Sequence, residues 1–306
     1  MDAIGISQRK LPELFESGQR IANITPEAAS RTGLSINTVV TSGALDQAAG
    51  MLGAGNIRQG IITETTGTCL AVCANLGSRF ASFEEGLLPI HYGIAPDSYY
   101  AIYWSPAAGS IYKWVRDTFY SDLDRKDLYS LMDREAERVT AGCDGLLLLP
   151  YLSGMNYPAN EELARGVFSG LSLQHTRAYF ARAVLESVAF LLRQSIEEVT
   201  GYGMEASGIY SLGGGAGDLW CQIKADVTGK SIHTIDVDEV ACHGAAMLAA
   251  VGSGLFLSYE EAVSAVREKQ VYRPVQPALY EGIYLNFLNK NKHYIAEMRA
   301  HFLKEK

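Results

Sequence analysis

Three consecutive glycines separate an apolar segment from an amphipathic one in residues 211–230, SLGGGAGDLWCQIKADVTGK. Glycine lets backbone amides approach a ligand without an intervening side chain, and it adopts backbone angles that other residues resist. A helix that follows such a turn presents free amides and the positive end of its dipole, which suits phosphate. The pattern is typical of a nucleotide site, although a tight turn between a buried strand and a packing helix would use the same residues.

A single acidic residue, Asp46, lies among small and apolar residues in TSGALDQAAGMLGAG at residues 41–55. Apolar surroundings raise the pKa of a carboxylate and exclude competing water, which suits a general base that acts on a hydroxyl group. Alternatively, Asp46 caps the helix that continues through Gln47, because Asp is a favoured cap residue. Both interpretations are open from this stretch alone.

Two apolar runs rich in β-branched residues flank a hydroxyl-rich turn in IITETTGTCLAV at residues 61–72. This pattern predicts a hairpin whose turn carries Thr66, Gly67 and Thr68. Hydroxyl groups and backbone amides around a glycine can hold phosphate oxygens. Any hairpin could use Thr and Gly in its turn, so this motif is weak when taken singly.

Together and in this order, the three stretches resemble the FGGY family of carbohydrate kinases. Four further segments are similar to its xylulose-kinase-like branch: ITPEAASRTGL at 24–34, YLSGMNYP at 151–158, ARGVFSGLSLQHTRAYFARAVLESVAF at 164–190 and HGAAMLAAVGSG at 243–254. The resemblance covers nearly the whole chain. It implies an α/β fold of the actin-like ATPase (ribonuclease-H-like) class, and mainly the second domain of a two-domain sugar kinase.

The resemblance also implies roles for single residues. Asp46 matches the catalytic base that takes the proton from the sugar hydroxyl attacking the γ-phosphate of ATP, and Gln47 matches a residue of the sugar pocket. The implied nucleotide-binding residues are Thr66, Gly67 and Thr68 in a phosphate motif, Gly109 near the phosphates or ribose, and Gly214, Gly215 and Asp218 in an adenosine motif. ATP and Mg²⁺ are the implied cofactors, a sugar or polyol such as a xylulose-like ketose is the implied substrate, and no metal ligand is assigned in this chain.

The sequence departs from the family pattern in two places. Family members carry one more residue between the glycines and the aromatic residue that corresponds to Trp220, which changes where the amides of Gly217 and Asp218 point. Full-length members are also much longer than these 306 residues. The first phosphate loop, an acidic residue near Mg²⁺ and most of the sugar-binding surface have no counterpart here.

Phosphoryl transfer depends on positioning and charge neutralisation around the γ-phosphate. We therefore expect this chain by itself to be an inactive or weak kinase, and the alternative is a non-catalytic fragment that binds a nucleotide or a partner. Exposure of a surface that faces the missing part predicts self-association, as in a homodimer.

Composition predicts a soluble cytoplasmic protein, with 48% hydrophobic and 20% charged residues. A formal net charge of −8 argues against nucleic acid as a partner. No apolar stretch reaches the length of about 18 residues that a membrane helix needs, and the pattern of the first residues leads us to expect no signal peptide. The five scattered cysteines are expected to be buried, reduced thiols, and neither disulfide partners nor zinc ligands.

Apolar periodicity predicts strands near residues 39–41, 61–64, 70–74, 99–103, 146–149 and 209–212, and helices over 109–119, 124–139 and 176–200. Thr25 and Pro26 predict the start of another helix, which Gly33 ends. Alternating strands and helices indicate a layered α/β fold. By the resemblance, residues 1–55 are the tail of the first, sugar-binding domain, 56–254 the second, nucleotide-binding domain, and 255–306 a helical C-terminal extension.

Three other residues allow either a structural or a functional interpretation. His175 precedes a predicted helix and is expected to cap it or pack there. His243, beside Gly244, is expected to lie in close helix packing. Trp220 could stack on adenine, but the amphipathic spacing of its helix favours a place at the edge of the core.

Overall fold

The computed structural model describes residues 5, 7–10, 12–78, 88–123, 126–156, 160–201 and 203–302. The chain forms two compact units. Unit 1 comprises Met1–Ile57, Gly93–Ser98 and Glu239–Val266, and unit 2 comprises Arg58–Tyr92, Tyr99–Asp238 and Arg267–Lys306. The end of the segment 151–158 and the first two residues of the helix predicted over 124–139 lie outside the described residues.

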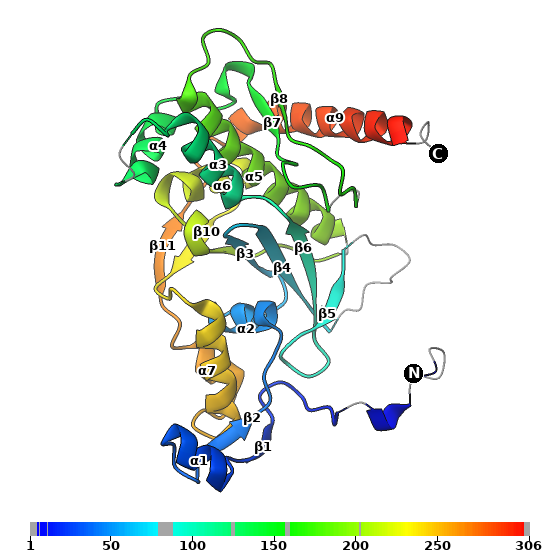
Figure 1. The fold of residues 1–306 in the computed structure, drawn as a ribbon, viewed down its shortest axis with the longest axis vertical. Helices are drawn as coiled ribbons and strands as arrows, with labels where there is room; N and C mark the ends of the chain where they lie inside the picture. The colour runs from blue at the N-terminus through cyan, green and yellow to red at the C-terminus, as the bar shows by residue number, and fades with distance from the viewer. Residues whose placement is uncertain are drawn as a thin grey trace. The chain divides into compact units, whose positions relative to one another are not determined.

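Unit 2 is built around a mixed sheet in which the described strands follow the order β11-β10-β9-β3-β4-β6-β5 (Figure 1). The strands are β3 (Ile61–Thr66), β4 (Leu70–Gly77), β5 (Ile90–Tyr92), β6 (Tyr99–Ser105), β9 (Gly208–Leu212), β10 (Ile232–Ile235) and β11 (Glu268–Tyr272). Strand β9 runs parallel to both of its neighbours, β3 and β10, and the other adjacent pairs are antiparallel. The apolar runs of β3 and β4 are buried, so the middle of the sheet forms the core.

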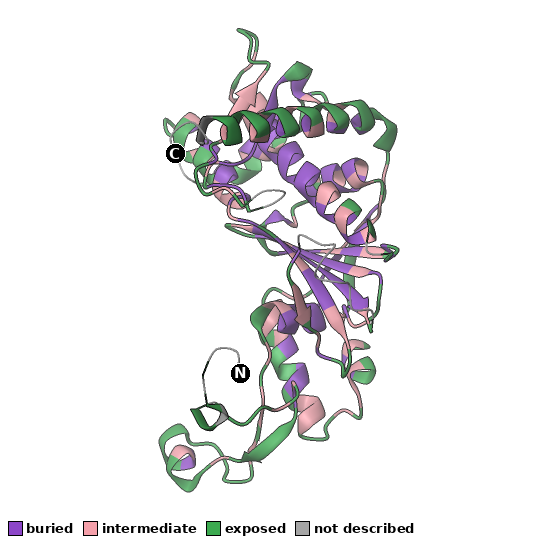
Figure 2. Cartoon of the chain, turned by 90° about the vertical axis from the view of Figure 1, so that its right-hand side faces the viewer, coloured by how far each residue is buried: buried purple, intermediate pink, exposed green. Residues whose placement is uncertain are grey.

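Helices of unit 2 pack on this sheet and on one another. They are α3 (Gly109–Phe119), α4 (Leu128–Glu137), α5 (Arg177–Gly201), α6 (Asp218–Thr228) and α9 (Pro277–Phe302), with short 3₁₀ turns η3 (Cys143–Gly145) and η4 (Gly213–Gly215). Most residues of α5 are buried, as its purple colour in Figure 2 shows, because it contacts α3, α4, α6 and strand β4. A two-stranded antiparallel ribbon of β7 (Leu147–Leu149) and β8 (Val167–Ser169) also contacts α5 through β7.

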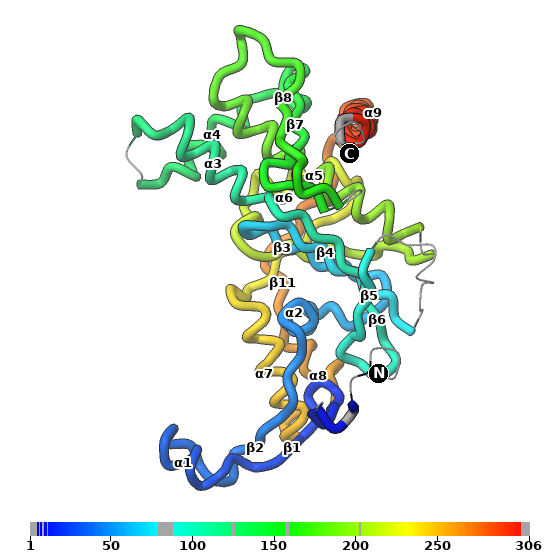
Figure 3. The backbone as a smooth tube through the Cα atoms, turned by 45° about the vertical axis from the view of Figure 1, so that its right-hand side comes forward, coloured from blue at the N-terminus to red at the C-terminus, as the bar shows by residue number. Residues whose placement is uncertain are grey.

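Unit 1 contains the antiparallel pair β1 (Arg20–Asn23) and β2 (Val39–Thr41), the 3₁₀ turn η2 (Gln8–Lys10), and the helices α1 (Pro26–Thr32), α2 (Asp46–Gly53), α7 (Val240–Gly252) and α8 (Tyr259–Val263). Helices α2 and α7 lie side by side (Figure 3). A Cβ on Gly244 would lie 1.8 Å from the Ala49 carbonyl oxygen, and one on Gly53 would lie 1.9 Å from the Val240 carbonyl oxygen. The small residues of both helices therefore allow contact between their backbones.

Most predicted elements are confirmed within one to three residues at their ends. Helix α3 has the predicted bounds, α5 begins and ends one residue later than predicted, and residues 61–77 form the predicted hairpin. Thr25 caps α1 by accepting the Ala28 N–H at 3.2 Å, and Gly33 ends it at a φ of 76°. The C-terminal region predicted to be helical also contains strand β11, which periodicity did not show.

All five cysteines are free, as predicted. The expectation that they are buried is wrong for Cys242, which is exposed, and Cys69 is partly exposed. The Nδ1–H of His243 donates a hydrogen bond to the Gly53 carbonyl at 3.0 Å, which agrees with the predicted packing role. Among the described residues, no helix is long and apolar enough to cross a membrane.

Candidate functional site

Two glycine turns of unit 2 meet at one edge of the sheet. Strands β3 and β9 are parallel neighbours, with Glu64 opposite Ser211, so their carboxyl ends lie together. The hairpin turn follows β3, and the glycine turn η4 follows β9. A Cβ on Gly215 would lie 2.3 Å from the Cβ of Thr66, so the second turn can pack on the first only with glycine at this position.

Helix α3 begins on the hairpin turn. The Gly109 N–H donates to the Gly67 carbonyl at 2.9 Å, and the Ser110 N–H donates to the Thr68 carbonyl at 3.2 Å. These bonds use two of the amides that a helix leaves unpaired at its start. Hence α3 is placed by backbone contacts with the turn and needs no side-chain cap, in agreement with the absence of a side-chain cap bond at Ala108.

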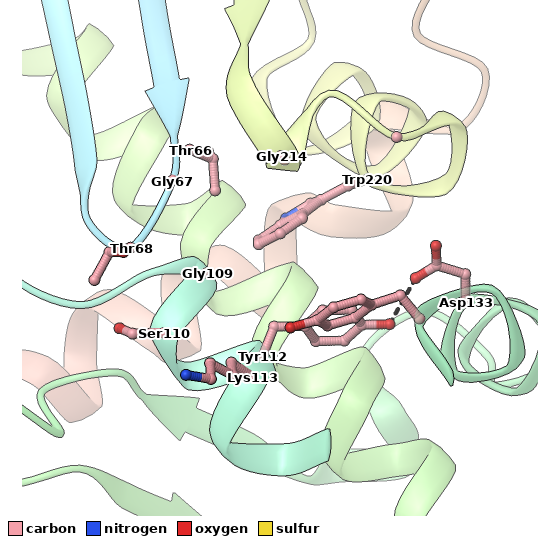
Figure 4. Close-up of a pocket in the computed structure, with 13 residues that line it drawn as sticks. Thr66, Gly67, Thr68, Gly109, Ser110, Tyr112, Lys113, Asp133, Gly214 and Trp220 are labelled. Atoms are coloured by element: carbon pink, nitrogen blue, oxygen red, sulfur yellow. Dashed lines mark hydrogen bonds between the residues drawn. The ribbon is translucent and has the colours of Figure 1, made fainter. Parts of the chain in front are cut away.

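These turns line one side of a pocket of about 490 Å³ (Figure 4). The described residues that line it are Thr66, Gly67, Thr68, Gly109, Ser110, Tyr112, Lys113, Tyr129, Asp133, Gly214, Gly215, Gly217 and Trp220. Backbone and hydroxyl groups dominate the end made by the turns, and aromatic rings dominate the end made by α3, α4 and α6. Such a volume lies within the range of small-molecule and cofactor sites, about 300–1,000 Å³.

Aromatic side chains from three helices form the second end of the pocket. The Trp220 ring lies 5.7 Å from the Tyr112 ring, and Tyr112 in turn stacks on Tyr129 at 5.9 Å. Trp220 is buried, and its indole N–H donates to the Leu185 carbonyl at 3.0 Å. The prediction of a place at the edge of the core is therefore refined: Trp220 belongs to the core and also lines the pocket.

One carboxylate borders this aromatic end. Asp133 accepts a hydrogen bond from the Tyr112 hydroxyl at 2.6 Å, which the dashed line in Figure 4 marks. Burial raises the pKa of Asp133, while the bond from Tyr112 opposes that rise. Burial, followed by the charge of Asp133, raises the pKa of Tyr112, so its hydroxyl stays a proton donor at neutral pH. Lys113 supplies a cation to the same lining.

The predicted nucleotide-binding residues are brought together, except for one. Thr66, Gly67, Thr68, Gly109, Gly214 and Gly215 line the same pocket, as the structure describes it. Asp218 lies outside this described lining: it is the first residue of α6, is exposed, and accepts a hydrogen bond from the Tyr272 hydroxyl at 2.5 Å. A role for Asp218 in nucleotide binding stays a prediction.

Thr66 lies at the pocket in a different way from the one its motif suggests. Its side chain is buried, and its hydroxyl donates to Glu64 at 2.7 Å. The hydroxyl therefore points into the protein, whereas Thr68, in the same turn, is exposed. Backbone atoms and the Thr68 side chain are the groups that this turn offers to a ligand.

Asp46 and Gln47 belong to unit 1. Asp46 is the first residue of α2, and its Oδ1 accepts the Gln47 N–H at 2.7 Å. The carboxylate thus binds an amide at the helix start, although the cap position itself is held by Leu45. Asp46 is exposed in this chain, so the apolar surroundings expected from its sequence neighbours are wrong for its side chain.

Several lining residues were not predicted. Tyr112 and Lys113 follow Gly109 by one helical turn, so the predicted helix over 109–119 could have indicated them. Tyr129 and Asp133 come from a different helix, α4, and no local signal relates that helix to a glycine turn.

A nucleotide fits these features. A Cβ on Gly67 or Gly217 would meet no heavy atom within 4 Å, so the backbone is open to a ligand there. Gly217 caps α6 without a side-chain bond, which leaves the first amides of that helix for an anion. The described residues contain no cluster of three His, Cys, Asp or Glu that could hold a metal ion. Mg²⁺ bound mainly through phosphates and water needs no such cluster.

Comparisons with known proteins agree with this geometry. Residues 64–253 match the C-terminal domain of the FGGY family of carbohydrate kinases, and residues 1–53 match its N-terminal domain. The chain is 35% identical over 277 residues to a xylulose kinase of Staphylococcus epidermidis, covering 89% of this chain and 55% of the relative. It is 33% identical over 273 residues to a xylulose kinase of Bacillus subtilis, covering 89% and 54%.

A solved structure is also similar. The crystal structure of xylulose kinase from Rhodospirillum rubrum matches with a TM-score of 0.85 and 28% identity, over 96% of this chain and 59% of that one. The fold and the pocket define an α/β protein of the actin-like ATPase class, as predicted. The chain belongs to the FGGY family of carbohydrate kinases. It spans about half the length of the curated relatives it matches.

Proposed function

We propose that this chain supplies the nucleotide-binding site of an ATP-dependent sugar kinase of the xylulose-kinase-like kind. The reaction is transfer of the γ-phosphate of ATP to a hydroxyl of a ketose or polyol. The observation that carries the proposal is the pocket in which two glycine turns meet an aromatic wall. Similarity to proteins named xylulose kinase supports a xylulose-like substrate.

Within the proposed site, the two ends of the pocket have different tasks. The backbone of Gly67, Gly214 and Gly217 and the start of α6 bind phosphate oxygens, while Trp220 and Tyr112 hold the base. When bound, ATP supplies the phosphoryl group, and Mg²⁺ neutralises charge on the phosphates. Because a cradle of backbone groups is already in place, little reorganisation is needed as the charge develops.

Asp46 is the proposed general base, and Gln47 is the proposed neighbour that lines the sugar pocket. An exposed carboxylate at the start of a helix can reach a hydroxyl group of a bound sugar and hold its proton. A bond between Asp46 and the Gln47 amide supports the role by orienting the carboxylate.

The proposed domain boundaries are residues 55 and 254. They are supported by family matches over residues 1–53 and 64–253. Residues 239–266 nevertheless belong to the compact unit 1, so the border between the two compact units does not coincide with the proposed domain boundary at 254.

Two further expectations belong to this proposal. A cytoplasmic location is supported by five free cysteines. Self-association as a homodimer is supported by exposed apolar side chains in unit 1, such as Leu14, Leu34 and Ile36. Sedimentation velocity at increasing protein concentration tests the dimer, and a constant monomer value at high concentration excludes it.

The alternative is a protein that binds nucleotide or a partner without turnover. Calorimetric titration of MgADP into the purified chain tests the nucleotide site, and the proposal expects saturable binding at one site. Incubation with MgATP and xylulose, followed by detection of sugar phosphate, then separates the two. Binding with turnover supports the kinase and excludes the alternative. Binding without turnover agrees both with a kinase chain that is inactive by itself and with the alternative, and no binding contradicts a nucleotide site in either case.

A further inference from the structure

A fully buried ion pair lies beneath the two glycine turns. Lys224 on α6 and Glu64 on β3 both have side chains with 0% exposure, and Nζ lies 2.5 Å from Oε1. Taking two charges out of water is costly, and hydrophobic residues of similar volume are often equally good or better for stability. The pair therefore calls for an explanation other than stability.

The hydrogen bonds of this pair reach both parallel strands and the glycine turn η4 at the phosphate end of the pocket. Lys224 Nζ donates to the Gly215 carbonyl at 2.8 Å, to the Ser211 hydroxyl at 3.1 Å and to the Thr66 hydroxyl at 3.2 Å. Glu64 accepts hydrogen bonds from the hydroxyls of Thr66 and Ser211. Together these residues join β3, β9, the turn η4 and α6 in one network.

Two members of the network, Thr66 and Gly215, line the pocket, while Lys224 and Glu64 lie outside its described lining. An ammonium group has three donor hydrogens, and Lys224 has four oxygen atoms of its own chain within hydrogen-bond distance. No proton is left over for a ligand. Lys224 Nζ also lies 5.1 Å from the centre of the ring of Trp220, which comes one turn earlier on the same helix and lines the pocket.

We propose that Lys224 and Glu64 are positioning residues of the nucleotide site: they set the separation of the two glycine turns and the place of Trp220 without touching the nucleotide. An apolar pair in their place would leave the buried carbonyl of Gly215 without its donor, and such a group lowers stability by about 1–3 kcal/mol unless it moves to find a partner. Movement of Gly215 would displace the turn from Thr66, on which it packs. This inference rests on the proposed nucleotide-binding function.

Helix α5 offers a matched control. Arg182 and Glu186 form a second buried pair, with side-chain exposures of 10% and 3% and a distance of 2.8 Å between Nε and Oε1. Arg182 also donates to the Tyr280 hydroxyl at 2.8 Å. Neither residue of the pair belongs to the described lining of the pocket. Neutralising this pair changes buried charge by the same amount at a different place.

The experiment compares two double variants of the full chain, Lys224→Met with Glu64→Gln and Arg182→Met with Glu186→Gln. Circular dichroism and urea unfolding first establish that each sample is folded. Titration calorimetry with MgADP then gives the affinity, and hydrogen exchange reports on the amides of residues 66–68 and 213–217. The single variant Glu64→Gln, which keeps the shape of the side chain and one of its two acceptor oxygens, replaces the first double variant if that one does not fold.

The first variant is expected to bind MgADP roughly tenfold more weakly or worse, by analogy with the loss of residues that orient metal ligands. Its amides at the two turns are expected to exchange faster, while the control keeps the affinity of the original chain within about twofold. Unchanged affinity and exchange in the first variant would overturn the inference, as would an equal loss of affinity in the control.

A failure of the proposed nucleotide-binding function would give a different result from a failure of the positioning role. If the original chain binds no MgADP, the nucleotide-binding proposal is wrong, and hydrogen exchange alone decides the positioning role. Faster exchange confined to the two turns then supports that role, and exchange that is unchanged or raised throughout the chain contradicts it.

Discussion

Gly109 and Gly67 touch through their backbones, since the N–H of the first donates to the carbonyl of the second at 2.9 Å. A Cβ on Gly109 would lie 2.3 Å from the same carbonyl oxygen. The start of α3 and the hairpin turn therefore move together, and any side chain at Gly109 must separate them.

Gly109→Ala is expected to weaken MgADP binding and to lower the free energy of unfolding by about 1–3 kcal/mol, the range for overpacked sites. Calorimetry and urea unfolding measure the two effects. Gly282→Ala is the matched control, because a Cβ there meets no heavy atom within 4 Å and Gly282 lies inside helix α9. Since Ala favours helix by up to about 1 kcal/mol over Gly, the control is expected to be neutral or stabilising. Normal MgADP binding by Gly109→Ala would contradict the link between α3 and the turn.

Tyr112→Phe removes the hydroxyl that donates to Asp133. Burial already raises the pKa of Asp133, and the hydrogen bond from Tyr112 partly counteracts that rise. Without this bond, the pKa of Asp133 is expected to rise further. The folded state then holds this proton more tightly than the unfolded state, whose Asp titrates near roughly pH 4. By linkage, the free energy of unfolding falls as pH increases above that value, and it falls further in the variant. Urea unfolding between about pH 4 and pH 7 tests the slope, and an identical slope in both proteins would disprove the effect.

The pKa of Glu135 is lowered in the folded state, whereas that of Asp133 is raised. The two hydrogen bonds that Glu135 accepts from Arg177, at 2.9 Å and 3.0 Å, are the largest cause that lowers its pKa, and Tyr120 donates a third. A lowered folded-state pKa contributes stability above the unfolded value of roughly pH 4, and that contribution is lost as pH falls through the folded value. Glu135→Gln is expected to be less stable at neutral pH and to lose less stability on acidification.

A neighbouring carboxylate on the same helix controls for this substitution. Glu137 is exposed, and Glu137→Gln removes one charge from α4 without breaking the bonds to Arg177. Urea unfolding at pH 7 and near pH 3 compares the three proteins. Equal pH dependence in Glu135→Gln and Glu137→Gln would show that the pair with Arg177 does not shift stability.

Asp46→Asn tests the proposed general base where sugar phosphorylation is detected. Removing a general base typically reduces kcat by about 10²–10⁴-fold, and MgADP affinity should be unchanged because Asp46 acts on the sugar. Glu27→Gln, an acidic residue in the first turn of α1, serves as the control and should keep full activity. Parallel loss of nucleotide affinity and turnover in Asp46→Asn would refute the assignment.

Local patterns in the sequence were sufficient for those elements whose signals lie within a few residues. The Thr25 cap and Gly33 end of α1, the hairpin of β3 and β4, and helix α3 were all predicted, because capping, alternation and helical period are short-range properties. Short strands such as β11 gave no such signal, since pairing with β10 and not its own pattern defines it.

Both the local sequence motifs and the tertiary structure were needed to define the pocket. Gly67, Gly214 and Gly215 were identified from motif residues, Gly109 was implied by the resemblance to the family, and Trp220 was considered as a stacking residue. Their meeting results from the parallel pairing of β3 with β9, two strands that are far apart in the sequence. The Tyr129 and Asp133 side chains joined them only because α4 packs against α3.

Only the tertiary structure showed which charged side chains are buried and paired with each other. Nothing in the strand that contains Glu64 or in the helix that contains Lys224 indicates that their charges meet with 0% exposure. The same pair turns the Thr66 hydroxyl away from the pocket, which its motif could not show. The sequence by itself determined which backbone segments can bend around a ligand, because glycine and periodicity act locally. Only the folded chain determined which polar groups remain available to that ligand, because contacts between distant parts of the sequence decide which donors and acceptors are already paired within the protein.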